Sequence, residues 1–277
     1  MGNSLRCSIF DPTGNITALA ESPVEAPLQP AVAADIMRRR PEVEQVGFLT
    51  LPDAPELPSL RMAGGEFCGN ASMCAAALTL LRRPPESDGE AVLLLRVSGA
   101  SQPVEVRLRA EGPRCWSAAV RMPPAQGIGE TDFCFGGLRG SLPLVRMEGI
   151  SHLIVEPESP FFSLLADRPA AERAVREWAR MLAVSGLGLM FLDNACRLTP
   201  LVHIPASDTL FWENSCASGS AAVGMALAGR TDAPVKLSLE QPGGTLRVES
   251  RPDGPTVLQG RTKLIAEYND DSPFSNK

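Results

Sequence analysis

Two stretches of this chain can form helices that belong only in the interior of a protein. The runs GNASMCAAALTLLRR (69–83) and ASGSAAVGMALAGR (217–230) carry small and apolar residues on all sides and almost no charge before the last turn. A helix that is apolar around its whole circumference has to be covered on every side. The intervening segments read mostly as short strands bounded by Gly and Pro. The sequence therefore predicts an α+β fold in which two sets of strands each surround one buried helix.

Helix and strand signals also suggest where the chain divides. A third, amphipathic helix is predicted over 167–186, with Asp167 as its cap. Pro84-Pro85 is expected to end the first buried helix and Gly229 the second. The segment PPAQGIGE (123–130) interrupts the strand pattern. We place a boundary there, which gives two halves, 1–124 and 125–261, with one buried helix each.

Composition narrows the class of protein. The chain has 277 residues and a net charge of −6, which does not favour binding to nucleic acid or to an acidic membrane. It contains no apolar run long enough to cross a bilayer and no secretion-signal pattern at its start, so we expect a cytoplasmic location. Seven cysteines, an odd number, indicate free thiols. With two histidines and no Cys-x-x-Cys pair, no metal site is predicted.

Each buried helix is preceded by a cysteine, Cys68 or Cys216. The free N–H groups and the dipole at a helix start stabilise a thiolate and can also hold a carboxylate. If the two halves face each other, one thiol can remove a proton from a carbon while the other delivers a proton to the opposite face. Most free cysteines only fill cores. Polar Asn70 and Ser218 directly after the two cysteines would serve a core badly, which favours the paired site.

Three other readings of these residues stay open. A cysteine hydrolase would pair one thiol with His152 or His203, but it leaves the second motif unexplained. A pyridoxal-phosphate racemase needs a Schiff-base lysine, and the three lysines lie at or near the C-terminus. We therefore expect no cofactor. A binding protein that holds a carboxylate at the helix starts, without turnover, is the third reading.

The two cysteine motifs resemble the signatures of the diaminopimelate epimerase-like superfamily. The likeness covers EFCGNA (66–71) and ENSCASGSA (213–221) and extends to DPTGNIT (11–17), EQVGF (44–48), VSG (97–99) and QPGG (241–244). Within the superfamily it is greatest to the histidine racemases of staphylopine-type metallophore biosynthesis. The resemblance implies two pseudo-symmetric halves, each a rolled, mostly antiparallel sheet around a central helix, with the active site in the cleft between them. It also implies that the strand 262–270 returns to the first half.

The resemblance also implies roles for individual residues. Cys68 and Cys216 would be the acid/base pair. Glu44 and Glu213 would each support a thiol or bind the substrate amine, and His152 would relay protons beside the pair, whereas His203 is read as structural. Contacts to the substrate are expected from Asn15, on the strand after PTG, and from Gly69, Asn70, Asn214, Ala217, Ser218 and Gly219.

Departures from the family pattern point to the substrate. Ala71 replaces the last glycine of the usual CGNG motif, and Ala217 follows the second cysteine where glycine is common. The Glu-Arg pair that would bind a distal carboxylate is replaced by FWENS (211–215). We therefore expect a cofactor-independent racemase that interconverts L- and D-histidine for an opine-type metallophore and that allows a homodimer. Alternatives are diaminopimelate epimerase, a racemase of another amino acid, a phenazine-type isomerase and a non-catalytic carboxylate-binding protein.

Overall fold

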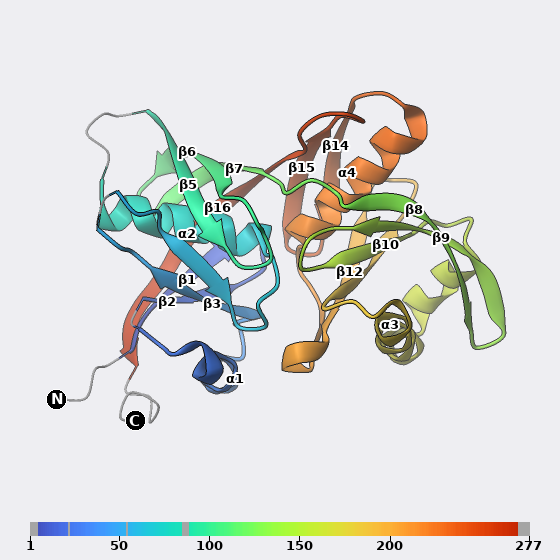
Figure 1. Cartoon of the computed structure of the whole chain (residues 1–277), viewed down its shortest axis with the longest axis horizontal. Coiled ribbons are helices and arrows are strands. Elements are labelled where there is room, and N and C mark those ends of the chain that lie inside the picture. Colours follow the sequence, from blue (N-terminus) through green and yellow to red (C-terminus); the bar gives the residue numbers. More distant parts are fainter. Residues whose placement is uncertain (1–4, 22, 54, 85–88, 271–277) are drawn as a thin grey trace. The chain divides into compact units, whose positions relative to one another are not determined.

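The computed structural model describes residues 5–21, 23–53, 55–84 and 89–270, and it divides into two compact units. The first unit consists of Met1–Arg121 and Gln259–Lys277, and the second of Met122–Leu258. The chain therefore leaves the first unit once and returns to it. Each unit is built from strands and a few helices (Figure 1).

Eight strands close the first unit into a barrel. Their order is β1-β2-β3-β4-β5-β6-β7-β16, and β16 also pairs with β1. Pairing is antiparallel between most neighbours but parallel for β2–β3 and β4–β5. The strands are β1 (Leu5–Pro12), β2 (Thr17–Ala20), β3 (Gln45–Thr50), β4 (Ser59–Met62), β5 (Glu90–Val97), β6 (Val104–Gly112), β7 (Cys115–Arg121) and β16 (Val257–Asp270).

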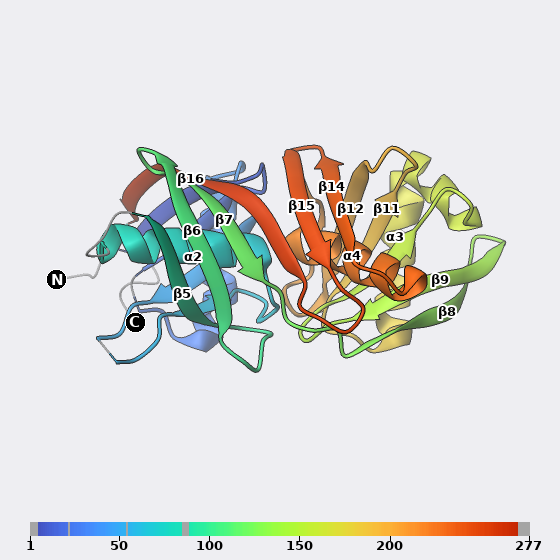
Figure 2. The same cartoon turned by 90° about the horizontal axis from the view of Figure 1, so that it is seen from above.

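Helix α2 (Gly69–Arg82) runs through this barrel and packs against β1, β2, β5, β6 and β7 (Figure 2). Its residues from Gly69 to Thr79 are all buried, as the uncharged sequence predicts. At its last turn Arg82 donates to Glu21 on one side of the barrel (2.7 Å) and to Glu267 of β16 (2.6 Å). These bonds fix the end of α2 opposite Cys68.

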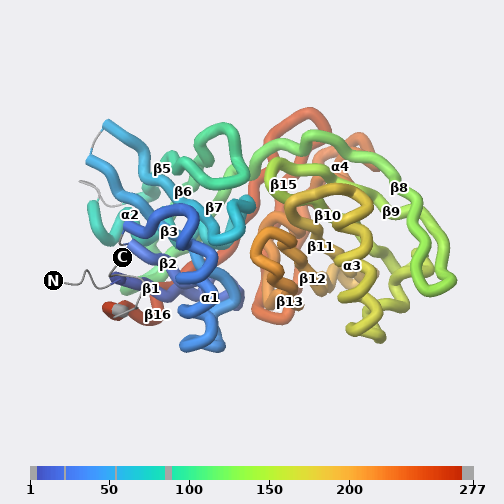
Figure 3. Tube along the Cα trace, turned by 60° about the horizontal axis from the view of Figure 1, so that its bottom comes forward, coloured from blue at the N-terminus to red at the C-terminus, as the bar shows by residue number. Residues whose placement is uncertain are grey.

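A second helix of the first unit, α1 (Gln29–Arg39), covers the outer face of β1 to β3 (Figure 3). Val32, Ala33 and Ile36 form its buried stripe, which packs with Val46 and Phe48. A short 3-10 turn, η1 (Ala26–Leu28), leads into it. Alternation along β3 then directs Gln45 and Gly47 to the opposite face, toward the barrel interior.

The second unit contains a six-stranded sheet of order β13-β12-β11-β10-β9-β8 and the hairpin β14–β15, which is not part of that sheet and whose β15 follows β16 in the strand order. Within the sheet β10 and β11 are parallel and the other pairs are antiparallel. The strands are β8 (Gly127–Phe135), β9 (Leu138–Arg146), β10 (Ser151–Val155), β11 (Leu187–Leu192), β12 (Leu198–Ile204), β13 (Thr209–Trp212), β14 (Val235–Gln241) and β15 (Gly244–Ser250).

Helix α4 (Ala217–Thr231) packs against the β14–β15 hairpin and also against β8 to β11 (Figure 2). Helix α3 (Arg168–Leu182) contacts β11 and β12, and its Trp178 packs on Phe133 and Phe161 with ring centroids 4.6 and 5.1 Å apart. Two 3-10 turns, η2 (Pro160–Ala166) and η3 (Pro205–Ser207), complete the unit. No helix in the described part of the chain is long and apolar enough to span a bilayer.

The structure corrects several details of the sequence prediction. The rolled sheet predicted for the first half is closed into a barrel by the pairing of β1 with β16. Helix α4 passes through Gly229 and ends at Thr231, and its C-cap Asp232 adopts the left-handed conformation (φ 48°). The segment 123–130 is not a break throughout, because β8 begins at Gly127. Asn15 precedes β2 instead of lying on it, and α1 was not predicted.

Candidate active site

Cys68 is the N-cap of α2. Its backbone is extended (φ −135°, ψ 112°), and the half-buried Sγ accepts a hydrogen bond from the N–H of Ala71 at 3.4 Å. The Ser72 hydroxyl bonds back to the Cys68 carbonyl at 2.8 Å. The thiol therefore lies at the positive end of a buried helix, where a negative charge on sulfur is stabilised.

A glutamine side chain contacts the thiol of Cys68. The sulfur donates to Oε1 of Gln45 at 3.1 Å, and Nε2 of Gln45 donates to Oγ1 of Thr17 at 2.8 Å. Thr17 and Gln45 are register partners on the parallel strands β2 and β3. Gln45 lies within the EQVGF motif, directly after Glu44, the residue of this motif for which the family resemblance implies a role.

The VSG loop after β5 holds the segment that leads to Cys68. Oγ of Ser98 donates to the carbonyl of Glu66 (2.8 Å) and accepts from the N–H of Met62 (2.9 Å). Gly99 has a positive φ of 69°, and a Cβ there would lie 2.8 Å from the Glu66 carbonyl carbon and closer still to the N of Phe67. The approach of the two backbones requires glycine at this position.

Cys216 occupies the equivalent position at α4. Its backbone is again extended (φ −124°, ψ 108°), and Ser220 bonds back to its carbonyl at 2.7 Å, just as Ser72 does in α2. Here a second glutamine holds the main chain: the N–H of Cys216 donates to Oε1 of Gln241 (2.8 Å), and Nε2 of Gln241 donates to Ser220 (3.0 Å). Gln241 belongs to the QPGG motif and was not predicted as a site residue.

The thiol of Cys216 has a carboxylate beside it. Burial raises the pKa of this thiol well above its usual value, and the charge of Glu213, which accepts a hydrogen bond from the sulfur, raises that pKa further. The N–H of Gly219 and the hydroxyl of Ser218, 3.7 Å from Sγ, act in the opposite direction on the same pKa. Glu213, Ser218 and Gly219 thus lie around the Cys216 thiol.

Aromatic packing fixes the strand that carries Glu213. The indole N–H of Trp212 donates to Glu172 of α3 at 2.9 Å, and the Arg168 guanidinium lies 4.6 Å from the centre of the same ring system. The N–H of Glu213 itself donates to the carbonyl of Pro200 at 3.0 Å. Helix α3 therefore holds the carboxylate in position beside Cys216.

His152 lies in the same region of the second unit. It is fully buried on β10, and its two ring nitrogens have no hydrogen-bond partner among the described residues. Burial lowers its pKa to about 3, so the ring is neutral at physiological pH. A Cβ on Gly188 would collide with Nδ1 of His152 and lie 2.6 Å from Cε of Met190. A Cβ on Gly219 would collide with Sδ of Met190 and lie 3.2 Å from Sγ of Cys216, so the Met190 side chain lies near both His152 and Cys216.

The remaining predicted residues lie at different depths. Asn15 and Asn70 are buried (1% exposed each), as are Gly69 and Ala217 at the two helix starts. Glu44 is half-buried and its N–H donates to Ile16, whereas Asn214 is exposed. His203 bonds to the carbonyl of Thr209 at 3.0 Å, in keeping with a structural reading. The described residues contain no group of three or more His, Cys, Asp or Glu that could hold a metal ion.

Comparison with known proteins identifies the family. The model described as "Histidine racemase CntK N-terminal domain" matches residues 5–261. A histidine racemase from Staphylococcus aureus is 30% identical over 251 residues, which is 88% of each chain. Another from Fusobacterium nucleatum is 29% identical over 265 residues, 93% of this chain and 94% of the relative.

Solved structures share the fold. A predicted epimerase from Pseudomonas aeruginosa superposes with a TM-score of 0.70 at 17% identity, covering 97% of this chain and 100% of that one. A probable proline racemase from Agrobacterium radiobacter gives 0.68 at 14% identity, covering 99% and 96%. With the family model matched over nearly the whole chain and the curated relatives along most of it, this chain belongs to the histidine racemase CntK family.

Proposed function

We propose that this protein is a histidine racemase that interconverts L- and D-histidine without a cofactor. The family and its curated histidine racemases support the substrate. The missing arginine before Cys216 favours a side chain without a distal carboxylate. D-Histidine made in this way would feed the biosynthesis of an opine-type metallophore.

The proposed mechanism uses the two thiols as a base and an acid. One sulfur takes the proton from Cα, the bonding electrons stay on the carbon, and the other sulfur delivers its proton to the opposite face. The N–H groups of the two helix starts, at Gly69, Asn70, Ala217, Ser218 and Gly219, would hold the substrate carboxylate and stabilise the charge that develops on it. Asn15 and Asn214 are proposed as further substrate contacts.

One observation carries this proposal: the two cysteines have the same local construction. Each is an extended N-cap of a buried helix, and each has its carbonyl bonded by the serine four residues later, at 2.8 and 2.7 Å. A cysteine that only fills a core needs neither an N-cap position nor a serine bonded to its carbonyl. The repetition also supports two pseudo-symmetric halves of the diaminopimelate epimerase type, divided as 1–124 and 125–261.

The carboxylates and His152 take supporting roles in the proposal. Glu213 would accept the proton of the Cys216 thiol, and Glu44 would bind the substrate amine or support Cys68. Neutral His152 would relay protons in the Cys216 region. The seven free cysteines suit a reducing compartment, so we propose that the enzyme acts in the cytoplasm, either alone or as a homodimer.

Incubation with L-histidine in D₂O, without added cofactor, tests the proposal. The expected result is D-histidine with deuterium at Cα. Chiral chromatography detects the D-enantiomer, and NMR detects the deuterium. Activity on another amino acid but not on histidine would keep the mechanism and reject the substrate. Diaminopimelate is the first alternative to include in the panel.

Replacement of each cysteine by serine separates a racemase from its alternatives. A two-base racemase loses turnover in both Cys68→Ser and Cys216→Ser, by about a hundredfold or more. A phenazine-type isomerase would not need both thiols. A carboxylate-binding protein would show heat of binding in calorimetry but no deuterium uptake with the unchanged protein.

A further inference from the structure

The turn that follows β1 carries backbone strain. Thr13 and Gly14 both have a positive φ, of 59° and 89°. Glycine adopts this left-handed conformation readily, but a β-branched threonine does so only at a cost. Turns with two successive positive φ values favour asparagine followed by glycine. A strained residue persists where its surroundings hold it, so the contacts of Thr13 should explain why the turn keeps this conformation.

The hydroxyl of Thr13 bonds to the main chain of β16. Its oxygen accepts from the N–H of Arg261 and donates to the carbonyl of the same residue, both at 3.2 Å. Pro12 and Thr262 are register partners, so Arg261 is the residue that the next step of the ladder would use. Opposing residues of an antiparallel ladder exchange the same two bonds through their main chains. The Thr13 side chain therefore continues the β1–β16 ladder by one step, although the main chain has already turned away.

Both sides of this contact are fixed by further bonds. In the turn, the carboxylate of Asp11 accepts from the N–H of Gly14 at 2.6 Å. On β16, Nε of Arg261 donates to Sγ of Cys115, the first residue of β7, at 3.0 Å. The hydroxyl of Thr13 thus joins a closed turn to a strand that is itself held in the barrel.

Asn15 follows the strained turn directly and is joined to the neighbourhood of Cys68. Its carbonyl accepts from the Thr17 hydroxyl at 3.0 Å, and that hydroxyl accepts from Nε2 of Gln45 at 2.8 Å. Oε1 of Gln45 lies 3.1 Å from Sγ of Cys68. The main chain of Asn15 is therefore three hydrogen bonds away from the thiol, within the same unit. The conformation of the turn decides where Asn15 enters this network.

We infer that Thr13 is a positioning residue: through its two bonds to Arg261 it holds the turn that places Asn15 for substrate binding. This inference rests on the proposed racemase function, in which Asn15 contacts the substrate. Such a contact is made with the bound substrate and with the transition state alike. Loss of the Thr13 hydroxyl should therefore act on KM more than on kcat.

Two substitutions at position 13 test the role of the hydroxyl. Thr13→Val keeps the shape of the side chain but cannot bond to Arg261, and it should raise the KM for L-histidine by about tenfold while kcat changes by less than about threefold. Thr13→Ser keeps the hydroxyl, and its KM should stay within about twofold of the wild-type value. A hydroxyl with only a structural role would lower the melting temperature of Thr13→Val and leave its KM unchanged, which would overturn the inference.

Thr13→Gly decides the question if Thr13→Val does not fold. Glycine adopts the left-handed conformation without strain, so the turn can form, but glycine offers Arg261 no hydroxyl. The KM for L-histidine should rise in this variant too, by about fivefold or more. A wild-type KM in Thr13→Gly would mean that the turn places Asn15 without its bonds to β16, and the inference would be wrong.

A double-mutant cycle tests whether Thr13 acts through Asn15. Asn15→Ala removes the proposed substrate contact, and adding Thr13→Val to it should raise KM by no more than about twofold further. If the two substitutions instead raise KM by the product of their single effects, Thr13 acts by a route that does not involve Asn15. That result contradicts the inference even if Thr13→Val alone has a high KM.

The outcomes also separate the inference from the function on which it rests. If the wild-type protein racemises histidine and both Thr13→Val and Thr13→Gly keep its KM, the function stands and the inference is rejected. If the wild-type protein neither racemises nor exchanges any amino acid, the proposed function is rejected and the inference falls with it. Amide hydrogen exchange at Arg261 gives a readout besides activity: it should be faster in Thr13→Val than in Thr13→Ser, and equal rates would contradict the hydroxyl contact.

Discussion

The missing side chain of Gly99 leaves room for the segment that carries Cys68. Its backbone approaches that of Phe67 so closely that any Cβ would overlap with the main chain, and main chain cannot turn away as a flexible side chain can. Placement of Cys68 therefore depends on a glycine in the loop after β5.

Gly99→Ala should displace the Glu66–Cys68 segment. We expect a loss of about 1–3 kcal/mol in the free energy of unfolding and at least a tenfold drop in racemase kcat, roughly what misplacement of a reacting group costs. Gly136→Ala is the control: it also has a positive φ (58°), but nothing lies within 4 Å of its Cβ. If both variants lose activity equally, crowding against Phe67 is not the cause.

His152 should make the second unit sensitive to acid. Its pKa is about 3 in the folded protein against 6.5 for an ordinary histidine, so the unfolded chain binds a proton between these values and the folded one does not. The contribution of the neutral His152 ring to the free energy of unfolding is therefore complete above pH 6.5 and is lost as the pH falls toward 3.

At about pH 5 the loss amounts to about 2 kcal/mol. Urea unfolding followed by tryptophan fluorescence at several pH values measures it. His152→Gln should flatten the decline between neutral pH and pH 5, and His203→Gln should keep the wild-type slope. A wild-type protein with no decline in this range would contradict the burial of a neutral ring.

Two glycines show how α4 fits its surroundings. Gly224 faces β15, and a Cβ there would collide with Cγ1 of Val248, whereas a Cβ on Gly229 meets nothing within 4 Å. Both lie within one helix, where alanine is intrinsically better than glycine by about 1 kcal/mol. Packing of α4 against the β14–β15 hairpin therefore decides whether a change from glycine to alanine stabilises or destabilises the protein.

Gly224→Ala should destabilise the protein by about 1–3 kcal/mol because α4 has to move away from β15. Gly229→Ala should stabilise it by about 0.5–1 kcal/mol, since it gains helix propensity at an exposed site. Thermal unfolding of the two variants beside the wild type gives both values. Stabilisation by Gly224→Ala would mean that α4 and β15 are not in contact.

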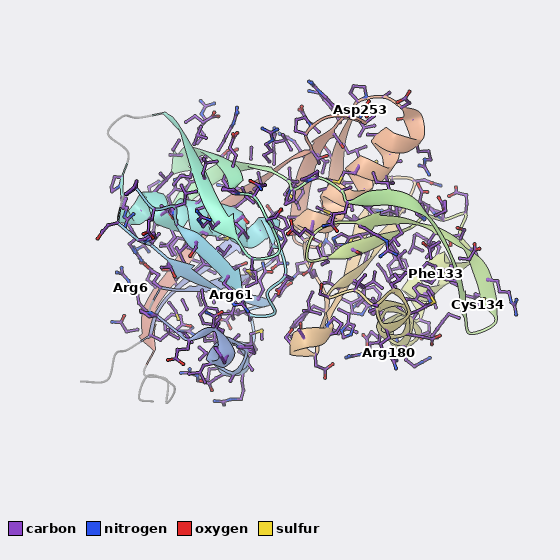
Figure 4. The ribbon with its side chains drawn as sticks, in the orientation of Figure 1. Arg6, Arg61, Phe133, Cys134, Arg180 and Asp253 are labelled. Carbon is purple, nitrogen blue, oxygen red and sulfur yellow. The ribbon has the colours of Figure 1, made fainter. Side chains whose placement is uncertain are left out.

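At the scale of the whole molecule, the seven thiols differ in access. Cys134 is exposed on the β8–β9 hairpin (Figure 4), Cys68 and Cys196 are half-buried, and Cys7, Cys74, Cys115 and Cys216 are buried. A helix start activates the thiols of Cys68 and Cys216 toward alkylating agents, whereas exposure favours Cys134.

Iodoacetamide should therefore label Cys134 first and Cys68 next, with Cys216 slow even near pH 9 because its pKa is raised. Histidine should protect Cys68 and Cys216 and leave the labelling of Cys134 unchanged. Peptide mapping by mass spectrometry resolves each site. Protection of Cys134 alone would place the ligand away from both helix starts.

The sequence predicted the buried helices well and their surroundings less well. The uncharged, Ala-rich runs could be placed nowhere but in a core, and both helices form there. Helix α1 was missed because its apolar stripe is short and polar residues interrupt it along the sequence. The end of α4 was misplaced because Gly229, in open space, has no reason to leave the helical conformation.

The residues of the site also differ in how far the sequence could reveal them. Cysteines and polar residues at helix starts are visible in a sequence because the motif is local. Gln45 and Gln241 were not, because each acts on a residue 23 or 25 positions away that only the folded strands bring near. EQVGF and QPGG contained the signal, but no periodicity says which side chain in such a motif faces a thiol.

The pairing of β1 with β16 has a consequence for how the molecule is made. Leu5 and Asp270 are register partners, so the first strand of the barrel is synthesised long before β16, the strand that closes it. The second unit, Met122–Leu258, is continuous and can acquire its structure in the meantime. The unit that begins first during translation is thus the one that finishes last, because its barrel cannot close around α2 before β16 has been made.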